Sequence, residues 1–368
     1  MNLTEGTDRI LSSLPEVIPS PPSQAGVDEA GPEAKSIQHS RLVSGGTFLF
    51  DSREDVPVVW GGDDGQVAWA QGEYLVIVGA AGLGKTTLAQ QLTLGRMGLL
   101  DTVLGMPVET GKLKTLYVAA DRPSQAQRSM RRMVKPSDRG LIDERLVVQR
   151  GPLPFDIGQD PQSLLAWLTD QGVDTLVIDS LKDVAVGVAK DEVGAAINVA
   201  LQLVLAAGIE VLVLHHQRKG AQGEKKPKNL DEVYGSVWIV NGAGSVILLW
   251  GQAGDPLVEL AHLKQPSETI GPWQIQHDHY LGSSTVLDEI KPIDVLRGAQ
   301  NGISARAMAV ALFKTQEPTP SEVEKARRRL DTLVRVGKAD CPDRGTNGGA
   351  GGGGTALYYP KNGLLEHP

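Results

Sequence analysis

The sequence predicts an α/β fold in which helices cover both faces of a mostly parallel sheet. Short apolar runs with strand character alternate with segments of helical composition through the middle of the chain. The run at 74–78 passes directly into a glycine-rich turn, and later runs also end in polar residues. Because ligands of such sheets bind at the carboxyl ends of the strands, we expect these polar ends to meet in one crevice.

The glycine-rich turn has the spacing of a phosphate-binding loop. Glycines let backbone N–H groups surround a polyphosphate, and the following helix directs its positive end to the same anion. Lys85 is expected to reach the β and γ phosphates of ATP, and the Thr86 hydroxyl to bind Mg²⁺. A turn that merely joins strand to helix is the alternative. The expected nucleotide-binding residues are Gly79, Ala80, Ala81, Gly82, Leu83, Gly84, Lys85, Thr86 and Thr87.

Three further strands end in residues able to do chemistry. The strand at 115–119 leads to Asp121, the strand at 174–178 to Asp179, and the strand at 210–214 to His215 and His216. Asp179 is expected to complete the Mg²⁺ shell opposite Thr86, although an acidic residue at a strand end also occurs in simple turns. The adjacent histidines are alternatively zinc ligands, but no cysteine lies near them.

Composition limits the other functions. The chain has 368 residues, one cysteine and a formal net charge of −8, so a reducing cytoplasm is expected and a wholly basic nucleic-acid coat is excluded. No apolar run approaches the length of a membrane span. Residues 1–40 are rich in proline, serine, glycine and acidic residues, and we expect a disordered arm there.

Two smaller patterns have structural interpretations. Trp60 and Trp69 belong to short strands before the phosphate loop, where core packing is favoured over stacking on adenine. His277, Asp278 and His279 resemble a metal cluster, but strand alternation sends the aspartate to the opposite face, so a solvated strand is expected.

A basic segment follows the strand that ends in the two histidines. Residues 217–229 contain five basic residues and one acidic residue, with no helical or strand periodicity. Because the segment leaves the sheet beside the expected γ phosphate, it is a candidate for nucleic-acid contact; a solvated loop is the alternative. The candidate contacts are Arg218, Lys219, Lys225, Lys226 and Lys228.

Residues 41–286 are expected to form the core and residues 287–368 a small separate domain. Helical patterns cover 291–299 and 304–313, and a capping box at Thr319 and Glu322 opens a helix that extends to Val336. Two strand-like pieces follow on either side of a glycine-rich tip, so the domain resembles a winged helix-turn-helix. Arg328 and Arg329 are candidate contacts to duplex DNA, and docking to a protein is the alternative.

With these residues in place, the chain resembles RecA-like ATPases of the DnaB and RepA replicative-helicase group. The resemblance covers about 60–279, and its closest form is the stand-alone helicase-like ATPase of actinobacteria and their phages. It implies that Asp121 activates the attacking water where the family has glutamate. It also implies that His215 and His216 sense the γ phosphate, and that 217–236 is a loop facing single-stranded DNA.

The resemblance also implies a residue that acts on the nucleotide of a neighbouring subunit. The stretch LAHLKQP supplies Lys264 for that role, but Pro266 occupies the position of the family's arginine. Arg218 or Lys219 is then needed as a substitute, or hydrolysis across the subunit interface is weak.

Together these features predict an ATP- and Mg²⁺-dependent motor on single-stranded DNA, a helicase of replication or recombination. The resemblance implies a ring or helical homo-oligomer, in the ring form a hexamer, with primase or other replisome proteins as partners and no membrane. The alternative is a DNA-binding ATP switch, such as a recombination mediator or an origin-binding regulator. A nuclease that uses the acidic strand ends is a further alternative.

Overall fold

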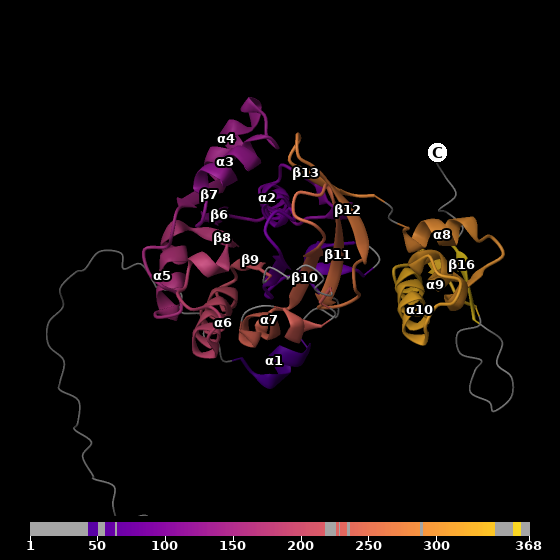
Figure 1. Ribbon diagram of the computed structural model, residues 1–368. Helices are drawn as coiled ribbons and strands as arrows, with labels where there is room; N and C mark the ends of the chain where they lie inside the picture. Colours follow the sequence, from indigo (N-terminus) through magenta and orange to yellow (C-terminus); the bar gives the residue numbers. More distant parts are fainter. Residues whose placement is uncertain are drawn as a thin grey trace, which may run out of the picture. The chain divides into compact units, whose positions relative to one another are not determined.

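A nine-stranded sheet forms the core of the computed structural model (Figure 1). The structure describes residues 43–50, 56–62, 65–217, 226–227, 229–233, 236–287, 290–342 and 356–361. The six strands from β10 to β7 are parallel, and β11, β12 and β13 continue the sheet in antiparallel order. In spatial order the strands are β13 (Ser283–Val286), β12 (Trp273–Asp278), β11 (Leu257–Lys264), β10 (Ser245–Trp250), β3 (Leu75–Gly79), β9 (Glu210–His216), β8 (Val173–Asp179), β6 (Lys114–Ala119) and β7 (Leu146–Arg150).

Strand β3 lies inside the sheet because all five of its residues are buried. Successive side chains alternate between the two faces, so Val76 and Val78 belong to one hydrophobic core while Leu75 and Ile77 belong to the other. Burying each such side chain contributes about 1.5–3 kcal/mol. The parallel strands therefore read as continuous apolar runs, as the sequence predicted.

Helices cover both faces of the sheet. The first core is shared with α5 (Pro161–Gln171), α6 (Asp191–Ala206) and α7 (Val237–Gly242), and the second with α2 (Lys85–Arg96). The second core also includes Trp60 and Trp69, whose indole N–H groups donate to the carbonyls of Val103 and Glu73. Both tryptophans are therefore core residues, in agreement with the interpretation favoured from sequence.

Shorter elements complete the core. They are α1 (Gly45–Phe50), β1 (Val58–Gly61), β2 (Val67–Ala70), β4 (Thr102–Val103), β5 (Met106–Pro107), α3 (Pro123–Arg131), η1 (Pro136–Asp138), α4 (Arg139–Arg145), η2 (Leu181–Asp183) and η3 (Leu230–Glu232). The sequence analysis did not predict α1, α3, α4 or α7. Proline at the first position of α3 leaves its missing N–H without consequence, and Arg128 and Arg131 favour the negative end of its dipole.

The C-terminal part has its own hydrophobic core, which includes Leu296, Met308, Leu330 and Tyr358. Its helices are α8 (Pro292–Gly298), α9 (Ala305–Phe313) and α10 (Pro320–Arg335), and its antiparallel sheet has the order β14 (Ile303–Ser304), β16 (Leu357–Pro360), β15 (Ala339–Asp340). The capping box of α10 is present as predicted, with Thr319 and Glu322 exchanging hydrogen bonds. The winged-helix assignment remains a prediction.

Within the described residues, no helix has both the length and the apolar character needed to cross a membrane.

Candidate functional site

A cavity of about 400 Å³ opens at the carboxyl ends of the parallel strands. We call it the polar cavity. It gathers the N-terminus of α2 and the residues that end β6, β8 and β9, so the expectation that separate strand ends meet is confirmed. Its lining residues are Ala81, Gly82, Gly84, Lys85, Thr86, Thr87, Ala119, Asp121, Arg122, Gln125, Ala126, Ser129, Arg132, Asp179, Ser180, His216, Gly254, His277 and His279.

Lys85 is the first residue of α2, and its ammonium group is held by the loop that precedes it. Nζ donates to the carbonyl oxygens of Gly79 and Ala80, each at 2.8 Å. Burial lowers the pKa of the Lys85 ammonium to about 8, against the attraction of Asp179. Two neutral carbonyls compensate little of the desolvation of a buried ammonium group, so an anion placed in the loop would gain a strong partner.

The N-terminus of α2 is open to a ligand. Gly84 precedes the helix with φ +80°, a left-handed conformation suited to glycine, and no side chain caps the first turn. The first N–H groups of a helix have no partners within the helix. Together with Lys85 they provide the donors that a polyphosphate needs.

Asp179 receives two hydrogen bonds on one oxygen. Thr86 Oγ1 donates to Oδ2 at 3.0 Å and the Tyr117 hydroxyl donates to the same atom at 2.7 Å. Burial raises the pKa of the Asp179 carboxyl, and these hydrogen bonds and Lys85 oppose the rise. A carboxylate and a hydroxyl in contact are oxygen ligands of the kind that Mg²⁺ takes together with phosphate oxygens, so the residues fit this metal.

His277 corrects one expectation from sequence. The prediction of a solvated strand is wrong here, because His277 is buried with Nε2 3.0 Å from the Leu83 carbonyl and Nδ1 2.7 Å from Ser284 Oγ. An added Cβ on Gly84 would meet its ring at 2.2 Å, so only glycine fits between them. Burial lowers the pKa of His277. The neutral ring therefore supports the phosphate loop from β12.

Asp121 lines the cavity within an ion-pair network. Its Oδ2 lies 3.5 Å from Arg122 Nε and 3.6 Å from Lys182 Nζ. The sequence analysis named Arg122 as a partner but missed Lys182, which follows β8. The two cations hold the partly exposed carboxylate at the mouth of the cavity.

The two adjacent histidines separate. His216 lines the cavity, whereas His215 is buried in β9 and does not, because successive strand residues face opposite sides. Burial, together with the Lys85 and Lys182 charges, lowers the pKa of His216 to about 4, so the ring is neutral at pH 7. In the part of the chain that the structure describes, no group of three or more metal-ligating residues supports the zinc alternative.

The predicted DNA-binding residues fall into three groups. Arg218, Lys219, Lys225 and Lys228 lie outside the described residues. Lys226 contacts the carboxylate of Glu259 on β11. On α10, Arg328 Nε donates to Glu324 at 3.1 Å, and Arg329 is buried with its guanidinium 6.0 Å from the centre of the Phe313 ring. Burial of Arg329 argues against a direct contact with DNA.

Lys264 lies apart from the polar cavity of its own chain. It ends β11, and its Nζ donates to the Asn241 carbonyl at 2.6 Å. A role on a neighbouring subunit's nucleotide therefore stays a prediction.

Sequence reasoning missed the residues that close the far side of the cavity. Arg132 Nη1 donates to the His279 carbonyl at 2.6 Å, which links the end of α3 to the turn after β12. Gln125 and Ser129 line the wall between them. No sequence motif marks these positions, because they come from a helix and a hairpin that meet only in the folded chain.

Residues 56–222 match the family model described as "AAA domain", which covers less than half of the chain. The core is a RecA-like P-loop ATPase domain. The match, the sheet order and the phosphate loop agree on this conclusion. No curated protein is significantly similar in sequence.

Among solved structures, the RecA-like P-loop domain resembles one described as an "ATPase Domain", with a TM-score of 0.42 and 13% identity, over 59% of this chain and 85% of that one. It also resembles a KaiC-like protein from the hyperthermophilic archaeon Pyrococcus horikoshii OT3. That similarity has a TM-score of 0.43 and 14% identity, over 64% of this chain and 99% of that one.

Proposed function

We propose that the protein is an ATP-driven motor on single-stranded DNA, a helicase that acts as a homo-oligomeric ring or helix. The observation that carries the proposal is the convergence of Lys85, Thr86, Asp121, Asp179 and His216 on one cavity. These residues come from four separate stretches of the chain. Nucleotide chemistry at one point can therefore act on several strand ends together.

In this proposal each residue has one task. Lys85 and the α2 N–H groups bind the β and γ phosphates, while Thr86 and Asp179 hold Mg²⁺. The metal would neutralise charge on the phosphate oxygens when bound. Asp121 orients water, and neutral His216 donates a hydrogen bond toward the γ phosphate.

The route to DNA begins at His216. Strand β9 ends at this residue, and the basic segment starts two residues later at Arg218. A change in the hydrogen bond of His216 on hydrolysis would therefore act on the first residues of a lysine-rich segment. Lys219, Lys225 and Lys228 supply positive charge for the phosphates of a single strand, each contributing to the salt dependence of binding.

One observation favours a second candidate, an ATP switch that binds DNA and hydrolyses slowly. Asp121 is shorter than glutamate, and its Oδ2 is already paired with Arg122 and Lys182, so the carboxylate is less free to accept a proton from water. Slow hydrolysis suits a timer, such as a recombination mediator, better than a processive motor.

Strand displacement separates these candidates. A fluorescent fork substrate with a single-stranded tail is incubated with the protein, ATP and Mg²⁺, and strand release is followed alongside phosphate release. A motor releases the strand in proportion to ATP turnover, and Lys85→Ala does neither while keeping the wild-type far-UV spectrum. ATP turnover with DNA binding but no strand release would establish the switch instead.

A further inference from the structure

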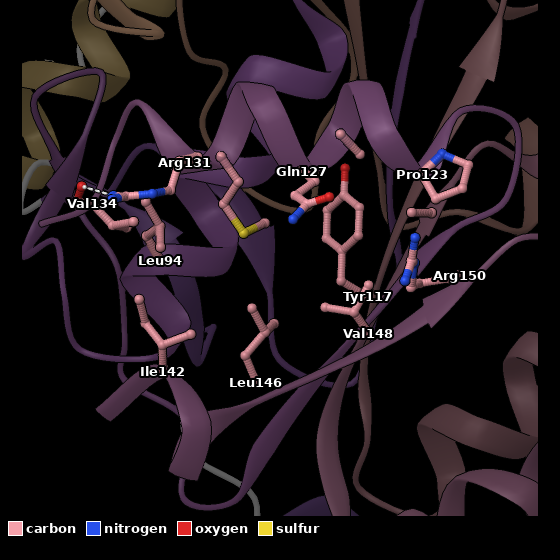
Figure 2. A pocket seen from close by; sticks show the side chains of 13 residues that line it. Leu94, Tyr117, Pro123, Gln127, Arg131, Val134, Ile142, Leu146, Val148 and Arg150 are labelled. Carbon is pink, nitrogen blue, oxygen red and sulfur yellow. Dashed lines mark hydrogen bonds between the residues drawn. The ribbon is translucent and has the colours of Figure 1, made fainter. Parts of the chain in front are cut away.

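A second cavity, of about 350 Å³, lies beside the polar cavity and has a different character (Figure 2). We call it the apolar pocket. Carbon atoms dominate its lining, with Leu94, Ile142, Leu146 and Val148 pointing into it in Figure 2. Pockets that hold an apolar group have this volume and lining. Its wall residues are Leu94, Tyr117, Ala119, Pro123, Ala126, Gln127, Met130, Arg131, Val134, Ile142, Leu146, Val148 and Arg150.

The position of the apolar pocket favours a polypeptide as its occupant. Its floor is β7, the last strand of the sheet, whose outer edge has no neighbouring strand among the described residues. Val148 on this strand is 45% exposed. An edge strand with exposed apolar side chains is a surface for chain–chain association.

Two guanidinium groups stand at the rim of the apolar pocket. Arg131 comes from the end of α3 and Arg150 from the end of β7, on opposite sides of the apolar lining (Figure 2). An occupant with an apolar part and an adjacent acidic part therefore matches the pocket in both shape and charge.

The chain itself contains such a segment. Helix α1 has no buried residue, and Phe48, Leu49 and Phe50 are 69%, 65% and 83% exposed. Three adjacent large apolar side chains left in water are unusual for a protein surface and mark an interaction site. The next residues are acidic at Asp51, Glu54 and Asp55, with one basic residue, Arg53.

We propose that the apolar pocket receives the Phe48–Phe50 segment of a second copy of this chain. The aromatic side chains enter between α3, α4 and β7, and the acidic residues that follow meet Arg131 and Arg150. The donor segment and the acceptor pocket are different surfaces, so the contact is head-to-tail and extends into a ring or a filament. This proposal rests on the oligomer of the proposed function and assigns the contact that forms it.

The first test measures assembly without nucleotide. Sedimentation velocity compares wild-type protein with Phe48→Ser/Phe50→Ser in the segment and with Val148→Asp in the pocket. Either change should weaken self-association at least about 10-fold, the effect of losing one well-buried anchor. Val186→Ser is the matched control, because Val186 is 80% exposed on another part of the core. Wild-type protein that stays monomeric, or variants that assemble normally, would overturn the proposal.

Mixing the two defective proteins identifies the direction of the contact. Phe48→Ser/Phe50→Ser retains its pocket and Val148→Asp retains its segment, so an equimolar mixture has one competent interface and should form dimers and nothing larger. A segment that folds back onto the pocket of its own chain would leave only monomers and would contradict the proposal. Val148→Ser replaces Val148→Asp if circular dichroism shows that the charged variant is unfolded.

A labelled peptide of residues 43–55 gives an independent measurement. It should bind full-length Phe48→Ser/Phe50→Ser protein, less tightly at about 0.5 M than at about 0.1 M salt, and should not bind when Val148→Asp is added. A peptide with both phenylalanines replaced by serine should not bind. These readouts require no ATP turnover, so loss of hydrolysis would count against the proposed function and loss of peptide binding against this inference.

Discussion

The polar cavity and the apolar pocket share two wall residues, Ala119 and Ala126, yet they are built on opposite principles. The polar cavity is formed by strand ends and a helix N-terminus, where backbone and side-chain donors meet. The apolar pocket is formed by the side of an edge strand and two helices. Ligand chemistry in this fold therefore concentrates where strands end, and association surfaces form where the sheet ends.

The two cavities also differ in their effect on stability. Burial moves the pKa values of Lys85, Asp179 and His216 toward the neutral form of each group. Charged groups that are buried without a full set of partners cost free energy of folding. The polar cavity therefore lowers stability until a ligand binds, whereas the apolar pocket lacks only the packing that an occupant would add.

Asp179→Asn is expected to give the largest effect and the sharpest test of this contrast. Loss of the carboxylate should reduce Mg²⁺-dependent ATP turnover at least about 10²-fold, as for removal of one electrostatic contact in a transition state. Asparagine still accepts the hydrogen bonds of Thr86 and Tyr117 but is uncharged. The unfolding midpoint without ligand should therefore stay the same or rise, as followed by circular dichroism. A fall in that midpoint would contradict the idea that the buried charge is costly.

His277→Ala tests the support of the phosphate loop. The substitution removes the ring beside Gly84 and the hydrogen bond to the Leu83 carbonyl. Affinity for Mg²⁺ and a non-hydrolysable ATP analogue should fall about 10-fold, or about 1.4 kcal/mol, as measured by calorimetry. His279→Ala is the matched control, since His279 also lines the cavity but is exposed. Equal losses in the two variants would show that His277 has no special role.

Leu146→Ala should produce the opposite profile in the apolar pocket. The half-buried side chain packs against the core, so truncation should lower the free energy of unfolding by about 1 kcal/mol. Nucleotide affinity should remain within about twofold of wild type, because no atom of Leu146 lines the polar cavity. Urea unfolding and calorimetry measure the two quantities. A large loss of nucleotide affinity would show that the cavities are not separable.

Glu210→Gln is expected to give the smallest effect and places a buried carboxyl outside both cavities. Burial raises the pKa of Glu210 from 4.5 to about 7, despite the hydrogen bond from the Gly72 N–H. The folded chain then binds more protons than the unfolded chain between these pH values, so wild-type stability falls as pH rises from 4.5 to about 7. The variant should lose less stability across this range, by on the order of 1 kcal/mol after allowance for partial exposure. Thermal melts at about pH 5 and about pH 8 measure it, and parallel pH profiles would rule out this titration.

The sequence alone could predict the strands and the phosphate loop because both depend on local patterns. Strand β8 ends in Asp179 and β9 in His216, and the carboxyl ends of parallel strands must meet. It could not predict α3 and α4, whose polar composition gives a weak signal, and so it missed the apolar pocket. His277 was misjudged because alternation assigns a side chain to a face but does not say what covers that face.

Tyr117 belongs to both cavities at once. Its ring is part of the wall shown in Figure 2, and its hydroxyl holds the oxygen of Asp179 that also accepts from Thr86. Anything that shifts this ring also shifts the hydrogen bond that keeps Asp179 oriented. Such a link acts with equal free energy in both directions. A neighbouring copy that pushes on one end of this phenol would change the hold on the metal, and the arrival of the metal would in turn change how firmly that neighbour is kept.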